Sequence, residues 1–172
     1  MDKVLTIRYA RRDDIYNVAT FLHDCWQTEY RGIITDDFLD AMTVDERHSG
    51  LLRRFDEGVS EFLLMYDGEE LIGAAVFGKS FTEGYGEDGE ISAIYLQSGY
   101  IGKGYGHRLF TEVERKLTAK GYAHLVLDLL EGNARALRFY LAHGYEKVAA
   151  GQIRLGEKEY PLVVLRKFDC AH

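Results

Sequence analysis

Hydrophobic and polar positions alternate in the first part of the chain, a pattern that predicts β-strands. Residues 4–10 (VLTIRYA) combine this alternation with β-branched side chains and predict an edge strand. Two further apolar runs, EFLLMYD at residues 61–67 and LIGAAVFG at 71–78, are separated by a turn that begins with Asp67 and Gly68. An Asp-Gly pair between strand-like runs predicts a β-hairpin.

Between the first strand and this hairpin, apolar residues recur at helical spacing. A first helix is expected with Ile15, Val18, Ala19 and Leu22 on one face. Further helices are expected from about Thr35, where side chains suited to a helix N-cap occur, and at residues 45–55.

The second half of the chain alternates between strands and helices. A polar, glycine-rich loop at residues 81–90 leads into a strand at 90–96, and a helix with an apolar stripe ends before Gly121. The remaining predicted elements are a buried strand at 124–130, a short helix at 133–143 and two antiparallel strands at 145–155 and 161–167.

The order of these elements predicts a mixed α/β fold. A strand–helix–strand unit across residues 90–130 requires one parallel crossover, whereas the hairpins make the other pairings antiparallel. We therefore expect a mostly antiparallel central sheet with helices on both faces. A length of 172 residues, with no repeat or linker, predicts a single domain over residues 1–172.

Composition limits the classes of partner. The formal net charge of −7 argues against nucleic acid, and no apolar run is long enough to cross a membrane. The acidity leaves room for a cationic substrate. Cys25 and Cys170 cannot build a disulfide framework or a zinc site, so no metal is expected. Without a recognisable signal peptide, a cytoplasmic location is expected.

Four glycines at positions 99, 102, 104 and 106 stand between a predicted strand and a predicted helix. This arrangement is typical of a loop whose main-chain N–H groups bind an anion. A P-loop is excluded because Lys103 is followed by Gly104. The dinucleotide pattern GxGxxG fails in both registers, at His107 and at Leu109, although Asp128 lies near the spacing expected of a ribose-binding acid.

The glycine loop resembles the acyl-CoA-binding loop of the GNAT family of N-acetyltransferases. The family pattern Q/R-x-x-G-x-G/A falls on Ile101, Gly104 and Gly106, and only Ile101 departs from it. The segment EGNARALRFYLAHGYE resembles a second motif of the family. Its matching positions are Asn133, Ala136, Phe139, Tyr140, Gly144 and Tyr145.

The resemblance implies a GNAT-type fold that binds acetyl-CoA and transfers its acetyl group to a primary amine by direct attack on the thioester. Main-chain groups of one strand would bind the pantetheine arm, with an N–H near Leu96 as the oxyanion donor. Asn133 is also a suitable helix N-cap. The implied acetyl-CoA-binding residues are Ile94, Tyr95, Leu96, Ile101, Gly102, Lys103, Gly104, Tyr105, Gly106, His107, Arg108, Asn133 and Phe139.

The resemblance also implies the acid–base groups. Tyr140 would protonate the leaving thiolate, since a phenol remains protonated at neutral pH, although a core tyrosine is the alternative. Glu90 would be the general base, because an amine is mostly protonated at neutral pH and must lose a proton. Other carboxylates that could act as the base are Glu83, Glu87, Asp88 and Asp128.

The acceptor is expected to be a small-molecule or peptide amine that the sequence does not identify. Trp26 and Tyr30, four residues apart on one helix, together with Asp128, are the candidate acceptor-binding residues, although such an aromatic pair is often core. A homodimer is left open. The alternatives to an enzyme are a non-catalytic acyl-CoA-binding module and, with less support, a dinucleotide-binding protein.

Overall fold

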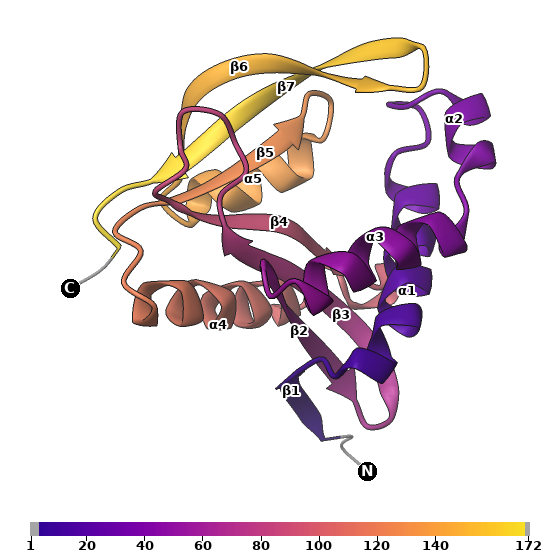
Figure 1. The fold of residues 1–172 in the computed structure, drawn as a ribbon, viewed down its shortest axis with the longest axis horizontal. Helices are drawn as coiled ribbons and strands as arrows, with labels where there is room; N and C mark the ends of the chain where they lie inside the picture. Colours follow the sequence, from indigo (N-terminus) through magenta and orange to yellow (C-terminus); the bar gives the residue numbers. More distant parts are fainter. Residues whose placement is uncertain (1–3, 171–172) are drawn as a thin grey trace.

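The structure is a computed structural model that describes residues 4–170. Its strands form one seven-stranded sheet in the order β1-β2-β3-β4-β5-β7-β6 (Figure 1). The strands are β1 (Leu5–Tyr9), β2 (Ser60–Asp67), β3 (Glu70–Lys79), β4 (Gly89–Leu96), β5 (Leu125–Leu130), β6 (Glu146–Leu155) and β7 (Lys158–Lys167). The α-helices are α1 (Ile15–Glu29), α2 (Asp36–Ala41), α3 (Val44–Asp56), α4 (Tyr105–Ala119) and α5 (Ala134–Ala142).

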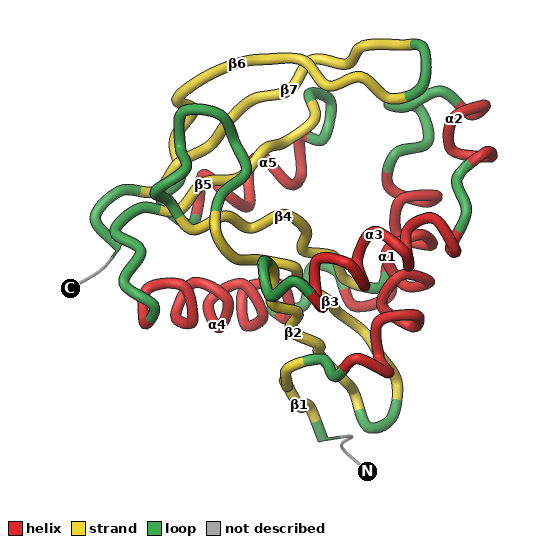
Figure 2. Tube along the Cα trace, in the orientation of Figure 1, coloured by secondary structure: helices red, strands yellow, loops and turns green. Residues whose placement is uncertain are grey.

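The pairing of the strands confirms the predicted sheet. β4 and β5 are parallel, and every other neighbouring pair is antiparallel. The crossover between the parallel strands contains α4, and β1 lies at an edge as predicted. Figure 2 shows the helices lying around this sheet, joined to its strands by short loops. A mostly antiparallel sheet of this kind differs from the parallel sheet of a dinucleotide-binding fold.

Helices cover both faces of the sheet and divide the core into two main clusters. On one face, Leu109, Phe110, Val113 and Leu117 of α4 pack with buried residues of the sheet, and α5 packs against the same cluster. On the other face, α1 and α3 pack against residues of β2 and β3. The apolar stripes read from the sequence are therefore the buried sides of the helices.

A third, smaller cluster joins α2 to the β6–β7 hairpin. It contains Tyr30, Ile34, Leu39 and Tyr160, all buried, and the Thr35 N–H donates a hydrogen bond to the Tyr160 hydroxyl at 3.0 Å. The hairpin therefore reaches the helical side of the molecule (Figure 1). Across residues 4–170, none of the helices combines the length and the apolar character that a membrane crossing requires.

Candidate active site

The two parallel strands separate shortly after they meet. β4 and β5 pair only through Gly89 with Leu125 and through Glu90 with Val126. On the other side of β4, the pairing with β3 slips by one residue, so that Ser92 is the extra residue of a β-bulge. A bulge bends and twists its strand. From Ile91 to Leu96, β4 therefore presents one main-chain edge to the gap that opens toward β5.

The glycine loop ends at the N-terminus of α4. Gly102 and Gly104 have φ angles of +82° and +90°, which side chains other than glycine rarely adopt. A Cβ at either position would have no protein atom within 4 Å. The Arg108 N–H donates to the Gly104 carbonyl at 3.2 Å, so the N–H groups before it have no partner from the helix. The loop is thus an open cradle of main-chain donors.

A cavity of about 440 Å³ connects this cradle with α5 and the separated strands. This volume lies within the usual range for small-molecule sites. Most of the predicted binding residues line it together, including main-chain segments of the glycine loop and of β4. They are Tyr30, Ile94, Tyr95, Leu96, Ile101, Gly102, Gly104, Gly106, His107, Asp128, Asn133, Phe139 and Tyr140.

Five predicted site residues lie outside the lining of this cavity. Lys103 and Arg108 are exposed beside the glycine loop, and Tyr105 packs against Tyr100. Trp26 packs instead against Tyr30, with ring centroids 4.7 Å apart, in the third core cluster. Glu90 lies in a second cavity that adjoins the main one.

The start of α5 confirms one predicted role of Asn133. Its side-chain oxygen accepts a hydrogen bond from the Ala136 N–H at 3.3 Å, which caps the helix. Two turns later, Tyr140 reaches the cavity. Burial raises the pKa of the Tyr140 hydroxyl above that of a free phenol, and Tyr30 and Glu29 act in the same direction. The hydroxyl is therefore protonated at neutral pH.

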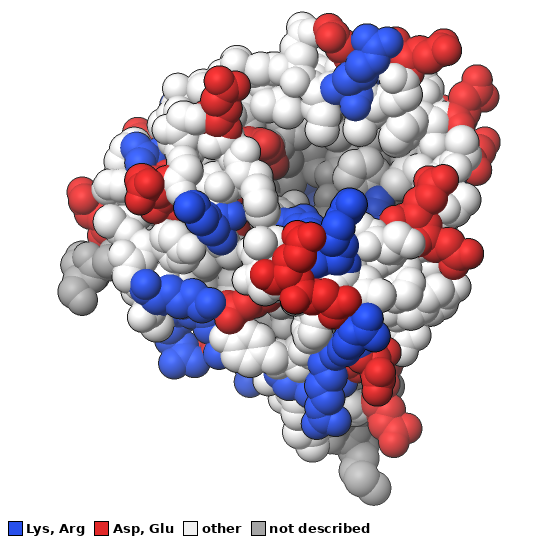
Figure 3. Space-filling model, viewed as in Figure 1, with Lys and Arg blue, Asp and Glu red and all other residues white. Residues whose placement is uncertain are grey.

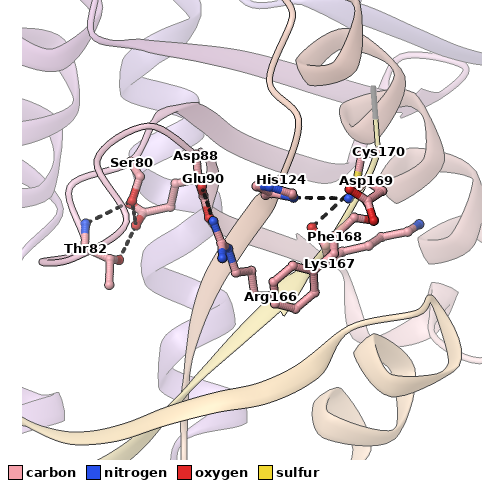
Figure 4. A network of polar contacts seen from close by, with 10 residues as sticks. All are labelled: Ser80, Thr82, Asp88, Glu90, His124, Arg166, Lys167, Phe168, Asp169 and Cys170. Atoms are coloured by element: carbon pink, nitrogen blue, oxygen red, sulfur yellow. Dashed lines mark hydrogen bonds and ion pairs between the residues drawn. The ribbon is translucent and has the colours of Figure 1, made fainter. Parts of the chain in front are cut away.

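Glu90 is held in a network of hydroxyl groups (Figure 4). Its Oε1 accepts hydrogen bonds from Ser80, at 3.2 Å, and from Thr82, and its Oε2 accepts one from Ser92 at 3.4 Å. The neighbouring Asp88 is buried and accepts two hydrogen bonds from Arg166, at 2.7 and 2.8 Å. Both carboxylates of this segment are therefore engaged by protein donors.

Asp128 has a different environment. It faces both the main cavity and the second one, and no side chain of residues 4–170 forms a hydrogen bond or ion pair with it. Glu90 is paired with Val126, and side chains two residues apart on a strand share a face, so Glu90 and Asp128 point to the same side of the sheet. Burial by the cavity walls, and then the charge of Glu90, raise the pKa of Asp128.

Among the cavity residues that were not predicted from the sequence, three are titratable: Glu29, Arg135 and His143. Glu29 of α1 accepts a hydrogen bond from the Asn133 amide at 2.9 Å and lies 3.5 Å from Arg135. His143 Nδ1 donates to the Phe139 carbonyl at 2.7 Å, so in a neutral pair its Nε2 accepts from His107 Nδ1 at 2.8 Å. Glu29 adjoins Tyr30 in the sequence, but only the fold brings it to α5.

The face of the molecule shown in Figure 1 is hollowed between the β6–β7 hairpin and α3 (Figure 3). Lys and Arg side chains border this hollow on the α3 side. On the wall of the main cavity, the Tyr30 and Tyr95 hydroxyls are hydrogen-bonded at 3.0 Å. The arrangement offers an anion cradle, an open strand edge, a protonated phenol and a free carboxylate around one space.

A family model described as the acetyltransferase (GNAT) family matches residues 18–145. A protein of Bacillus subtilis (strain 168), named uncharacterized N-acetyltransferase YuaI, is 31% identical over 146 residues. The match covers 85% of this chain and 83% of the Bacillus protein.

Solved structures of similar fold include two N-acetyltransferases. The ribosomal-protein-alanine N-acetyltransferase from Brucella melitensis has a TM-score of 0.73 and 20% identity, over 95% of this chain and 99% of that one. The paia N-acetyltransferase from Thermoplasma acidophilum, in complex with coenzyme A, has a TM-score of 0.75 and 19% identity, over 96% of this chain and 99% of that one. At sequence identities of 19–20%, these similarities support the fold of this chain and no more.

Proposed function

The chain belongs to the GNAT family of acetyltransferases, and from this premise we propose that it transfers the acetyl group of acetyl-CoA to a primary amine. The amine attacks the thioester directly, without a covalent enzyme intermediate. The observation that carries this proposal is the continuous cavity from the N-terminus of α4, past the free edge of β4, to the Tyr140 hydroxyl. The acceptor is a small-molecule or peptide amine.

The residues around the cavity fit the chemistry of coenzyme A. The N–H groups at the start of α4, and the positive end of its dipole, suit a diphosphate, and the open space beside Gly102 and Gly104 leaves room for one. The free edge of β4 at residues 94–96 can hydrogen-bond the amides of the pantetheine arm as an added strand would. When bound, acetyl-CoA supplies an activated acetyl thioester.

Tyr140 is the proposed general acid. Because burial raises its pKa, the hydroxyl keeps its proton at neutral pH and can donate it to a leaving thiolate. Within residues 4–170, no side chain or main-chain group hydrogen-bonds this hydroxyl, so the proton is not committed to a protein acceptor. A main-chain N–H near Leu96 is the proposed donor to the carbonyl oxygen as negative charge develops on it.

Asp128 is the proposed acceptor of the proton that the amine must lose, either directly or through a water. Its carboxylate is free and faces the main cavity, whereas both oxygens of Glu90 are held by hydroxyls. Glu90 shares the second cavity with Asp128, and its charge makes Asp128 more basic. Glu90 therefore contributes to the proton transfer by tuning its neighbour.

One departure from the family pattern favours a second candidate function. Ile101 stands where the loop usually has glutamine or arginine, so one side-chain contact to the nucleotide is missing. A non-catalytic acyl-CoA-binding module would retain the main-chain cradle and would not catalyse acetyl transfer. Binding and turnover must therefore be measured separately.

The test combines a thermal-shift measurement with an assay of thiol release. Acetyl-CoA at a hundred times its Kd should add about 2.7 kcal/mol to the free energy of unfolding. Amines should then release free thiol, and Tyr140→Phe should lower kcat by roughly 10²- to 10⁴-fold with little change in the Kd of acetyl-CoA.

The exposed Tyr16 provides the matched control, since Tyr16→Phe should leave both quantities unchanged. Stabilisation by acetyl-CoA without turnover of any amine would favour the binding module. Failure of acetyl-CoA to stabilise the protein would contradict both functions.

A further inference from the structure

Arg47 of α3 is a half-buried cation that has no acidic partner among the described residues. Its Nε is buried and unsatisfied, and across residues 4–170 its guanidinium forms no ion pair or hydrogen bond with another side chain. The groups that interact with its charge are Tyr95, Cys25 and Tyr30, which are neutral at neutral pH. The other buried or half-buried arginines find hydroxyl or carboxylate partners, as Arg8, Arg54 and Arg166 do.

A buried N–H donor without a partner is unfavourable for folding, so the unsatisfied Nε of Arg47 calls for a reason. The guanidinium lies over the Trp26 ring, 5.0 Å from the centroid, but this contact leaves the in-plane N–H donors unused. These donors have the fork geometry that matches a carboxylate. The chain carries 28 acidic residues and none of those described is paired with Arg47, which leaves the site free for an external anion.

Arg47 is linked to the wall of the main cavity through Trp26. Its guanidinium lies over the Trp26 ring, and this ring packs against Tyr30, a residue that lines the cavity, with ring centroids 4.7 Å apart. The Tyr30 hydroxyl is hydrogen-bonded to the Tyr95 hydroxyl at 3.0 Å, and both residues line the same cavity as Tyr140, the proposed acid. Asp128 and Arg47 both lie on the face of the sheet that α1 and α3 cover, opposite α4. The hollow seen in Figure 3 is bordered by basic side chains on the side of α3, the helix that carries Arg47.

We propose that Arg47 determines acceptor specificity by binding a carboxylate group of the acceptor while the acceptor's amine meets Asp128. The acceptor class is therefore an amine that also carries a carboxylate, as a free amino acid does. This inference rests on the proposed function and adds the chemistry of the acceptor to it. The acidic loop at residues 83–90 does not oppose it, because Asp88 and Glu90 are engaged by protein donors.

The experiment compares each common amino acid with its own carboxamide as acceptor, using thiol release from acetyl-CoA. Rates are corrected for the fraction of neutral amine, because the amide lowers the amine pKa. The wild-type protein should show a kcat/KM about 10- to 100-fold higher for the best carboxylate than for its carboxamide, the range expected of a charge-assisted hydrogen bond.

Arg47→Gln should abolish this preference through the KM of the acceptor and leave the KM of acetyl-CoA unchanged, whereas Arg47→Lys should retain part of it. Arg53→Gln, an exposed cation of the same helix, is the matched control and should keep the wild-type ratio. If Arg47→Gln does not fold, Arg47→Lys provides the test: a reduced ratio is expected, and an unchanged wild-type ratio would overturn the inference.

A wild-type ratio near one, or a preference for the carboxamides, would overturn the inference while amine acetylation itself stood. A preference that survived in Arg47→Gln would also overturn it. Absence of thiol release with every amine would instead count against the proposed function, so the two failures are distinguishable.

Discussion

At the scale of single residues, the site separates two carboxylates by their surroundings. Glu90 and Asp128 point to the same face of the sheet, on strands that separate after the first two paired residues. Hydroxyl donors engage both oxygens of Glu90, whereas Asp128 has no such donors, and its partial burial and the charge of Glu90 raise its pKa. When two neighbouring acids have environments that separate their pKa values, they commonly take different roles in acid–base catalysis.

The pH dependence of activity tests this assignment. A base must be ionised, so kcat/KM should rise with pH through the pKa of Asp128, which lies above the ordinary aspartate value. Asp128→Asn should remove this acidic limb and lower kcat/KM by roughly 10²- to 10⁴-fold. The measurement is a pH–rate profile with an acceptor of known amine pKa. The limb that reports ionisation of this amine should appear both in the wild type and in Asp128→Asn.

Asp24→Asn is a suitable control, because Asp24 is an exposed acid of α1 outside the main cavity. Retention of the acidic limb in Asp128→Asn would remove Asp128 from the proposed role and return it to Glu90.

At the scale of elements, α4 has glycines with similar backbone conformations at its two ends. Gly104 at the N-terminus has a φ of +90° and Gly121 after the C-terminus has a φ of +96°, and neither has a protein atom near its Cβ position. A side chain at either position costs about 1–2 kcal/mol of stability, because L-residues disfavour this conformation. Only Gly104 faces the cavity.

Gly104→Ala and Gly121→Ala should therefore destabilise the protein by similar amounts, about 1–2 kcal/mol each, as measured by urea unfolding. Only Gly104→Ala should weaken acetyl-CoA binding, because its methyl group would occupy the space beside the main-chain donors. Isothermal titration calorimetry with acetyl-CoA measures the affinity of both variants. Equal affinities would show that the cradle does not bind this ligand.

At the scale of the whole molecule, two groups of strands meet at a short seam. β1–β4 join β5–β7 through only two paired positions between β4 and β5. The ion pair of Asp88 with Arg166 spans this seam (Figure 4). Asp88 directly precedes β4, and Arg166 is a residue of β7 that is paired with Val126 of β5. It closes the sheet at the end where the strands are still together.

Arg166→Met should lower the free energy of unfolding by about 3–5 kcal/mol, because it leaves the buried Asp88 carboxylate uncompensated. Adding Asp88→Asn to this variant should restore most of the loss, since the isolated charge is then gone. Chemical denaturation of the wild type, both single variants and the double variant forms the cycle. A loss below about 0.5 kcal/mol in Arg166→Met, the size typical of a surface substitution, would mean that the pair acts as an exposed one.

The sequence by itself determined the elements, the mostly antiparallel sheet and the two motifs. Helical stripes such as Leu109, Phe110 and Val113 repeat over a few residues, so local periodicity was enough to predict which side is buried. The capping role of Asn133 was predicted for the same reason, because a cap depends on residues three positions away.

Only the tertiary structure decided where the strands separate, which carboxylate is free and which cation lacks a partner. Ser80 and Thr82, on the other side of a loop, donate hydrogen bonds to the Glu90 carboxylate. Glu29 accepts a hydrogen bond from Asn133, although the two residues are more than a hundred positions apart in the sequence. Arg47 is distinguished only by its contacts, because none of the acids among residues 4–170 forms an ion pair with it and its buried Nε has no partner. Such surroundings are set by contacts between distant segments, and periodicity along the chain carries no information about them.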